Sequence, residues 1–160
     1  MNVRWQLCRI AGVVALLVAA SQLPATADPD FCVFNVITGV AFGNYDVLNP
    51  AQTTMNGTIS YSCFKFPAAG ETVFITLSRG NAPTYSPRYM LSGAVHLNYN
   101  LYLDAGLTKI WGNGTGGSSQ FSKLTLNGVV VPVTIYGAIP AGQDVTPGAY
   151  NDTITVTINW

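Results

Sequence analysis

The last stretch of the chain alternates between apolar and polar side chains. The polar residues that alternate with the apolar ones are Thr153, Thr155, Thr157 and Asn159. The apolar side chains on one face are Ile154, Val156, Ile158 and Trp160. Apolar residues at every second position predict a β-strand with one buried face. Because edge strands are normally blunted by charges or prolines, and this one is not, we expect something else to cover it.

Short alternating stretches recur along the rest of the chain, at residues 31–37, 57–63, 72–78, 95–103, 124–126 and 129–136. Turn-forming residues separate them, and no segment has a helical period. Residues 79–93 are predicted to form a long loop with two prolines, and residues 112–119 a flexible glycine loop. The pattern predicts an all-β fold, an antiparallel immunoglobulin-like β-sandwich of six or seven strands.

The composition narrows the range of partners. The chain has 160 residues and is 49% hydrophobic but only 9% charged, against about 25% charged in ordinary globular proteins. Basic and acidic residues number seven each and form no runs. These features exclude electrostatic binding of nucleic acid as a predicted function.

Residues 1–27 have the three-part layout of a secretory signal peptide. Two arginines precede an apolar stretch over residues 10–20, and the segment ends in Ala25-Thr26-Ala27. The apolar core is shorter than the roughly 20 residues of a membrane-spanning helix. We therefore expect cleavage after Ala27, export without stable membrane insertion, and a single domain over residues 28–160.

Cleavage would leave two cysteines, Cys32 and Cys63. Two cysteines in an exported chain most simply form one disulfide. A catalytic pair would more usually sit closer together, as in a C-x-x-C motif. The predicted role is therefore structural.

The sequence offers little catalytic chemistry. His96, the single histidine, lies mid-strand on the face opposite the apolar one. The loop GNGTGGSS lacks the Gly-Lys-Ser/Thr of a phosphate-binding loop, and no helix follows it. Once the cysteines pair, no His/Cys metal-ligand set remains. We predict a protein that is not an enzyme and carries no cofactor or metal.

Several longer motifs occur together in this chain. They are FCVFNVITGVAFGNYDVLNP, GTISYSC, SPRYML, LNYNLYLDAGLTKIWGNGTGG and VPVTIYGAIPAGQDVTPGAYNDTITVTINW. In this order they strongly resemble the spore coat protein U domain family, over residues 31–160. That family occurs in secreted bacterial proteins and in subunits of archaic chaperone–usher pili.

The resemblance implies a sandwich that lacks its last strand. In the pilus members a periplasmic chaperone inserts a strand beside the terminal strand, and the next subunit's N-terminal extension later replaces it. By position, Ile154, Val156, Ile158 and Trp160 would border this gap, and Cys32 and Cys63 would be the disulfide of the family. The implied partners are a periplasmic chaperone, an usher and other pilus subunits.

One feature departs from a polymerising pilin. With cleavage after Ala27, only residues 28–31 precede Cys32, too few to serve as a donor strand. The expected role is a structural or adhesive subunit at the end of a fibre, or a minor subunit, that reaches the cell surface through the periplasm. A coat protein that does not polymerise by strand exchange is an alternative within the same family.

A third function, from another class, is a secreted carbohydrate-binding module. Trp111, Tyr85 and Tyr89 lie at loops or loop edges, where their rings could stack on sugars; the competing interpretation is that Trp111 and Tyr89 cap the ends of the sandwich core. Arg88, one of five basic residues of the mature chain, is expected to form an ion pair with Asp104 or Asp152. Three glycines are interpreted as turn residues with positive φ: Gly137, Gly142 and Gly148.

Overall fold

Eight antiparallel strands form two sheets in the computed structural model, which describes residues 29–160. The predicted signal peptide, residues 1–27, lies outside the described residues. The strands are β1 (Phe31–Thr38), β2 (Thr53–Phe64), β3 (Glu71–Leu77), β4 (Arg88–Ser92), β5 (Val95–Tyr102), β6 (Phe121–Thr125), β7 (Val131–Ile139) and β8 (Val156–Asn159).

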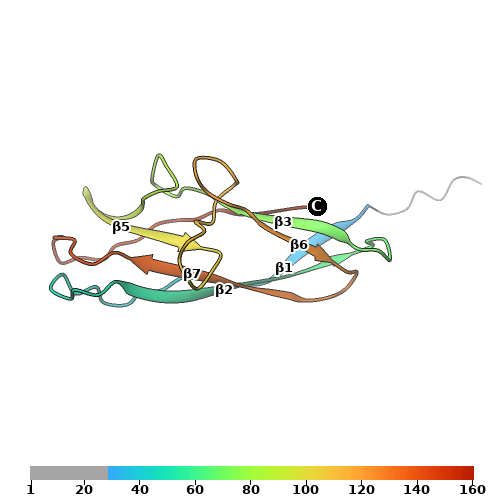
Figure 1. The fold of residues 1–160 in the computed structure, drawn as a ribbon, viewed down its shortest axis with the longest axis horizontal. Helices are drawn as coiled ribbons and strands as arrows, with labels where there is room; N and C mark the ends of the chain where they lie inside the picture. Colours follow the sequence, from blue (N-terminus) through green and yellow to red (C-terminus); the bar gives the residue numbers. More distant parts are fainter. Residues whose placement is uncertain (1–28) are drawn as a thin grey trace, which may run out of the picture.

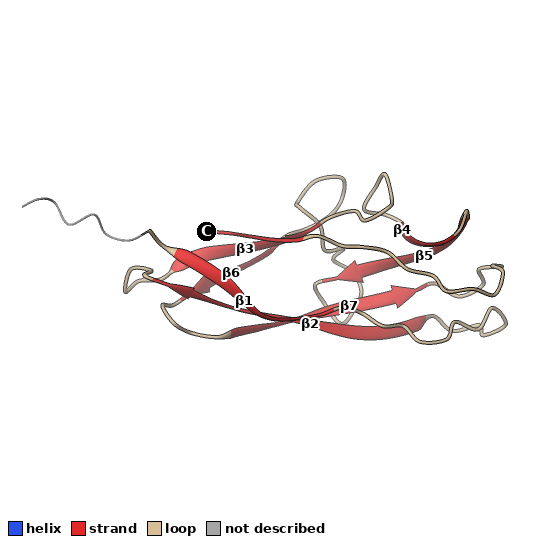
Figure 2. Ribbon diagram, turned by 180° about the vertical axis from the view of Figure 1, so that it is seen from behind, coloured by secondary structure: helices blue, strands red, loops and turns tan. Residues whose placement is uncertain are grey.

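The larger sheet has the strand order β1-β2-β7-β5-β4, and the smaller sheet has the order β6-β3-β8. The molecule is elongated, with β5 toward one end and β1 and β6 toward the other (Figure 1). Strands and loops make up the whole of the described chain (Figure 2). The predicted all-β sandwich is therefore confirmed, with eight strands in place of six or seven.

Two strands differ from the sequence prediction. β4 lies within residues 79–93, which were predicted to be loop, and it pairs along its whole length with β5. β8 is shorter than predicted, because only Val156–Asn159 pairs with β3. Upstream of β8 the alternation of half-buried and exposed residues continues from Asn151, but the backbone there bonds to other partners.

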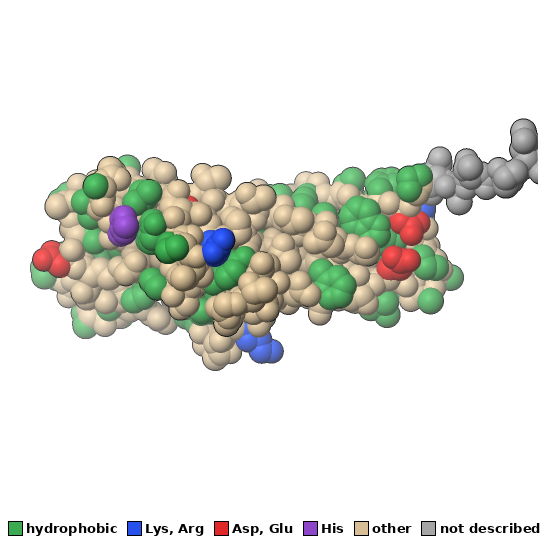
Figure 3. All heavy atoms as spheres, turned by 90° about the horizontal axis from the view of Figure 1, so that it is seen from above, with side chains coloured by type: hydrophobic (Ala, Val, Ile, Leu, Met, Phe, Trp, Pro, Cys, Tyr) green, Lys and Arg blue, Asp and Glu red, His purple; other side chains and the backbone are tan. Residues whose placement is uncertain are grey.

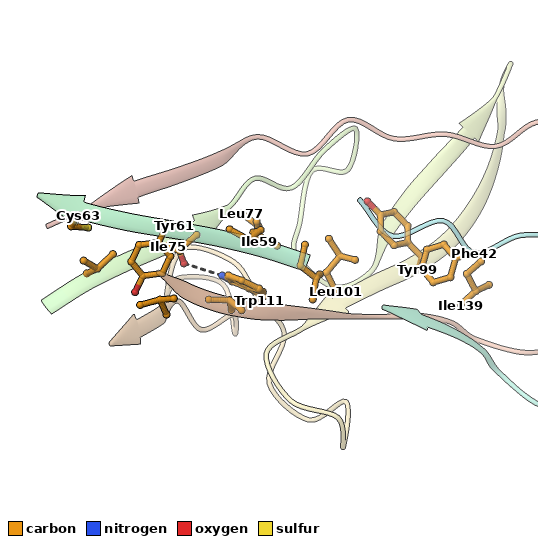
Figure 4. Packing of buried hydrophobic residues seen from close by; sticks show 14 of the residues in the cluster. Phe42, Ile59, Tyr61, Cys63, Ile75, Leu77, Tyr99, Leu101, Trp111 and Ile139 are labelled. Atoms are coloured by element: carbon orange, nitrogen blue, oxygen red, sulfur yellow. Dashed lines mark hydrogen bonds between the residues drawn. The ribbon is translucent and has the colours of Figure 1, made fainter. Parts of the chain in front are cut away.

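Alternating apolar residues of both sheets form the core where the two sheets face each other. Ile59 and Tyr61 of β2 meet Val73 and Ile75 of β3, and all four are fully buried. The Tyr61 hydroxyl shares a hydrogen bond of 2.9 Å with Thr125 Oγ1. Burial raises the pKa of Tyr61 above its usual value. We call this part of the molecule the closed end; its side chains are drawn in Figure 4.

The Cys32–Cys63 disulfide links β1 to β2 at the closed end. The two residues are direct cross-strand partners in the β1–β2 ladder. The bond closes a sequence separation of 31 residues, which stabilises a fold by about 3–4 kcal/mol through the lost entropy of the unfolded chain. The cross-link fixes an edge strand of the larger sheet.

Toward β4 and β5 the smaller sheet ends, and irregular backbone replaces it. Residues 39–47, which follow β1, and residues 145–155, which precede β8, line a hollow over the inner side of the larger sheet. Long loop segments accompany β5 and β7 at this end (Figure 2). We call this part the open end.

Candidate functional site

The main surface feature is a groove that runs along the open side of the sandwich. One part, of about 300 Å³, lies between the end of β1 and residues 150–156. A second part, of about 740 Å³, lies between residues 40–47 and 145–150. The two parts share Val40, Phe42, Met90 and Tyr150, so they lie next to each other along the same side of the sandwich. We call the two parts together the open groove.

The floor of the open groove is apolar. It is made by Leu77 of β3, Leu101 of β5 and Ile135 of β7, all buried, together with the ring of Tyr99. Ile37, Val40 and Phe42 form one side, and Ile154 and Val156 form the other. An apolar groove beside an open strand edge suits a polypeptide strand whose alternate side chains are hydrophobic.

Two glycines allow residues 38–42 to lie directly on the larger sheet. A Cβ atom on Gly137 of β7 would approach Val40 Cγ1 to 2.6 Å and Phe42 Cζ to 2.9 Å. A Cβ atom on Gly57 of β2 would approach the Thr38 carbonyl oxygen to 2.6 Å. The Phe42 ring then packs edge-on against the Tyr99 ring, with the centroids 5.9 Å apart. Gly137 is therefore a close-packing glycine within a strand.

The other side of the groove is fixed by Asp152. The Tyr99 hydroxyl donates to Asp152 Oδ2 at 2.7 Å, and the Asn81 N–H donates to Asp152 Oδ1 at 2.9 Å. Burial, followed by this contact with the carboxylate, raises the pKa of Tyr99 well above its usual value. These bonds attach the segment before β8 to the floor of the groove and to the loop after β3.

Backbone bonds hold the same segment at two further points. The Asn151 and Leu91 N–H groups each donate to the other's carbonyl, at 3.1 and 2.8 Å. The Ser78 N–H donates to the Thr155 carbonyl at 2.9 Å, and the Thr155 N–H donates to Ser78 Oγ at 2.9 Å. Residues 151–155 are thus positioned without a regular strand partner, which leaves their groove-facing side chains half-buried.

Among the described strands, β8 pairs with β3 alone, and β1 pairs with β2 alone. Of the four predicted edge residues, Ile154 and Val156 line the open groove. Ile158 is half-buried and packs against the core, and Trp160 remains 46% exposed. The structure brings these residues to one edge.

Sequence reasoning missed the opposite side of the groove. Ile37 lies at the end of β1, and Val40 and Phe42 lie in a stretch interpreted as turns. In the sequence ITGVAF, the apolar residues Ile37, Val40 and Phe42 are too few to be recognised as a strand, and Gly39 interrupts them. Met90 and Tyr150 also line the groove and come from segments far apart in the chain.

The three predicted surface aromatics do not form a binding face. Trp111 is 0% exposed, and its Nε1–H donates to the Ile75 carbonyl at 2.9 Å (Figure 4). Tyr85 is 7% exposed. The burial of Trp111 agrees with the competing interpretation, that it packs against the sandwich core, and Tyr85 is likewise too buried for its ring to stack on a sugar. Tyr89 is half-buried and stacks on His96, with the ring centroids 4.1 Å apart.

Arg88 is fully buried, and the predicted ion pair is wrong. Its guanidinium donates to the Ser78 carbonyl at 3.1 and 2.9 Å, to Asn100 Oδ1 at 2.7 Å and to the Trp111 carbonyl at 2.6 Å. All these acceptors are neutral. Burial lowers the pKa of Arg88. The side chain joins four segments of the core and has no exposed surface for a ligand.

Of the other two glycines predicted to have positive φ, the prediction is confirmed for Gly142 and wrong for Gly148. Gly142 has φ +74° and is a turn glycine as predicted. Gly148 is not among the glycines with positive φ; a Cβ atom there would meet Ser92 Oγ at 2.6 Å.

In the described part of the chain, no cluster of metal-ligating side chains indicates a metal site. Residues 29–160 contain no cluster of three or more His, Cys, Asp or Glu side chains able to hold a metal ion. Within the same residues no helix is long and apolar enough to span a bilayer. On the face drawn in Figure 3, charged side chains are few and hydrophobic ones are scattered among polar ones.

Comparison with known proteins agrees with the sequence motifs. The model of the Spore Coat Protein U domain family matches residues 15–157. A relative from Myxococcus xanthus named Protein U is 38% identical over an alignment of 137 residues, and the match covers 74% of this chain and 70% of the relative.

A solved structure shares the fold. It is the CsuC–CsuE chaperone–tip adhesion subunit pre-assembly complex from the archaic chaperone-usher Csu pili of Acinetobacter baumannii. The matching chain superposes with a TM-score of 0.56 at 23% identity, over 82% of this chain. The match spans 40% of the length of that solved chain, and at this identity the likeness concerns the fold.

Proposed function

Because the chain belongs to the Spore Coat Protein U domain family, we propose that it is an exported, non-enzymatic subunit of a bacterial surface assembly of the chaperone–usher type. In this proposal the open groove accepts a strand from another polypeptide. The first such partner is a periplasmic chaperone, and the later one is another subunit of the fibre. The protein passes through the periplasm and acts at the cell surface.

The observation that carries the proposal is the open groove with an unpaired strand edge beside it. Ile154 and Val156 present alternate apolar side chains to the groove, and β8 has β3 as its one partner among the described strands. A strand that enters the groove can bond to an open backbone edge while its own alternate side chains cover the exposed or half-buried apolar side chains of the groove's sides, such as Ile37, Ile154 and Val156. Both contributions favour an extended, apolar, uncharged segment.

The length of the groove indicates the length of the incoming strand. Its sides extend from Ile37 to Val47 on one side and from Val145 to Val156 on the other. Strand residues advance about 3.3 Å each, so a segment of roughly ten residues is needed to lie along the whole hollow. A shorter segment would leave part of the groove uncovered.

The test uses two neighbouring positions on the same segment. Ile154 faces the groove, whereas Thr155 is exposed on the other face. When the chain is co-expressed with the periplasmic chaperone from its gene neighbourhood, we expect the parent chain and Thr155→Asp to co-purify with it. Ile154→Asp should not, because the new carboxylate would lie in the apolar interface without a partner.

Folding is checked separately, through formation of the Cys32–Cys63 disulfide and the circular dichroism of each variant. A milder variant, Ile154→Ala, should weaken binding while the domain stays folded. Equal binding by Ile154→Asp and Thr155→Asp would contradict the proposal. So would a parent chain that is a stable soluble monomer and does not change when the chaperone is present.

A terminal or minor position in the fibre is a finer part of the proposal. It rests on the predicted cleavage after Ala27, which leaves residues 28–31 ahead of Cys32. Such a subunit accepts a strand but has too short an extension to donate one. Mass spectrometry of the exported protein tests this: a mature chain that begins at Asp28 supports it, and a longer mature N-terminus contradicts it.

A coat protein that does not polymerise by strand exchange is the second candidate, and the name of the matching family favours it. The folded domain would be the same, but the groove would be filled by another coat component or by none. A gene next to usher and chaperone genes favours the pilus assignment. A solitary gene that is induced during cell differentiation favours the coat assignment.

A further inference from the structure

The chain contains the same tripeptide twice, in two different structural settings. Asn56-Gly57-Thr58 lies within β2, and Asn113-Gly114-Thr115 lies in the glycine loop between Trp111 and β6. An asparagine followed by glycine is chemically labile, because glycine has no side chain to hinder attack by its own backbone nitrogen on the asparagine side chain. We propose that Asn113 is a site of spontaneous deamidation, and that the fold protects Asn56.

The bonds that change are those of the Asn113 side-chain amide. The Gly114 backbone nitrogen loses its proton and attacks Cγ of Asn113, and the side-chain nitrogen leaves as ammonia. The product is a cyclic succinimide. Water then opens one of its two C–N bonds and gives either an aspartate or an isoaspartate. Water is the only co-reactant, and nothing is oxidised or reduced.

The loop gives the Gly114 nitrogen room to react. Asn113, Gly114 and Thr115 are all exposed, and Gly114 has φ +87° with no atoms within 4 Å of the place where a Cβ would lie. Glycine adopts such a backbone conformation without strain and can leave it again at little cost. The ring closure therefore meets no packing barrier at this position.

Thr115 also activates the carbon that is attacked. The Thr115 N–H donates to Asn113 Oδ1 at 3.1 Å, and the Thr115 hydroxyl donates to the same oxygen at 2.7 Å. These two bonds hold the side-chain amide over the following peptide group. They also stabilise the negative charge that develops on Oδ1 during the attack, as two donors to an oxyanion do in acyl-transfer enzymes.

The other copy of the tripeptide is held in a form that cannot cyclise. Asn56, Gly57 and Thr58 all pair with β7. Gly57 is buried, and the Thr38 carbonyl oxygen lies 2.6 Å from the place where its Cβ would be. In a strand the side chain stands perpendicular to the sheet, away from the next backbone nitrogen. The same tripeptide is therefore expected to deamidate at Asn113 and to stay intact at Asn56.

The test compares both sites within one molecule. The purified chain is incubated at mildly alkaline pH, and peptides that contain each site are followed by mass spectrometry over time. We expect conversion of Asn113 to aspartate and isoaspartate while Asn56 keeps its amide. In the same chain unfolded by urea with its disulfide reduced, the two sites should react at similar rates, since their triplets are identical.

Two variants examine the role of the Thr115 hydroxyl. Thr115→Val should slow conversion of Asn113 by about fivefold, the effect of one ordinary hydrogen bond, and Thr115→Ser should restore the parent rate. Equal reaction of Asn56 and Asn113 in the folded chain would overturn the proposal. So would an unchanged rate in Thr115→Val, or a glycan attached to Asn113 in place of deamidation.

Discussion

The closed end and the open end of the sandwich are built from the same kind of alternating sequence, but they bury it to different degrees. At the closed end, strands of both sheets face each other, and Ile59, Val73 and Ile75 are fully buried. At the open end, residues 39–47 and 145–155 stand where strands would be expected, and Ile37 is 51% exposed. An apolar pattern therefore shows which side chains can be buried. Whether a given side chain is buried depends on whether another strand of the same chain packs over it.

The closed end and the open end also differ in the hydrogen bonds that their polar side chains make. At the closed end and its border, Trp111 and Arg88 each bond to backbone carbonyls from distant segments. At the open end, a single carboxylate, that of Asp152, connects the groove floor to the segment before β8. We infer that the closed end sets the stability of the isolated domain, and that the open end sets its capacity to bind another strand.

The largest predicted effect compares two tryptophans. Trp111 is fully buried at the closed end, and Trp160 is half-exposed beyond β8. Trp111→Ala should lower the free energy of unfolding by about 3–5 kcal/mol, because it creates a large cavity. Trp160→Ala should lower it by no more than about 0.5 kcal/mol, as for surface substitutions.

Guanidinium denaturation of the two variants, each with the disulfide intact, measures both values. Similar losses from the two substitutions would contradict the division into a closed and an open end. If Trp160→Ala lowers stability only in the complex with the chaperone, the distinction between the closed end and the open end becomes sharper.

A smaller effect is expected at the contact between the groove floor and the segment before β8. Tyr99→Phe removes the hydroxyl that donates to Asp152. A hydrogen bond to a charged group is worth about 1.5–3 kcal/mol, and the loss should appear in the free energy of unfolding. Tyr89→Phe is the matched control, because its hydroxyl donates to the neutral Asn81 carbonyl and should contribute only about 0.5–1.5 kcal/mol. An equal or larger loss in Tyr89→Phe would show that Asp152 does not hold this side of the groove.

The sequence predicts those strands in which one face is consistently buried. In β3 and β5, apolar residues occur at every second position, and both strands lie where the alternation indicated. β4 was missed because its five residues follow a proline-containing loop and begin with Arg88, a charged residue that normally indicates exposure. Its burial depends on acceptors from Ser78, Asn100 and Trp111, which no local pattern reveals.

The candidate site could be predicted on one side only. The edge residues before and within β8 follow one another in a regular alternation, whereas Val40 and Phe42 contact the sheet through a glycine nearly a hundred positions away, Gly137. The local sequence of Gly137 indicates a turn, because a close approach between distant segments leaves no mark on the neighbouring residues in the chain.

Hydrogen exchange along the chain tests the central claim most directly, since it reports on the groove and the core in one experiment. In the isolated protein, we predict fast exchange for peptides covering residues 39–47 and 145–155, and slow exchange for β3. When the chaperone is bound, exchange in the two groove segments should slow markedly while β3 stays unchanged. Groove segments that are already protected in the isolated chain, and that do not change on binding, would contradict the account.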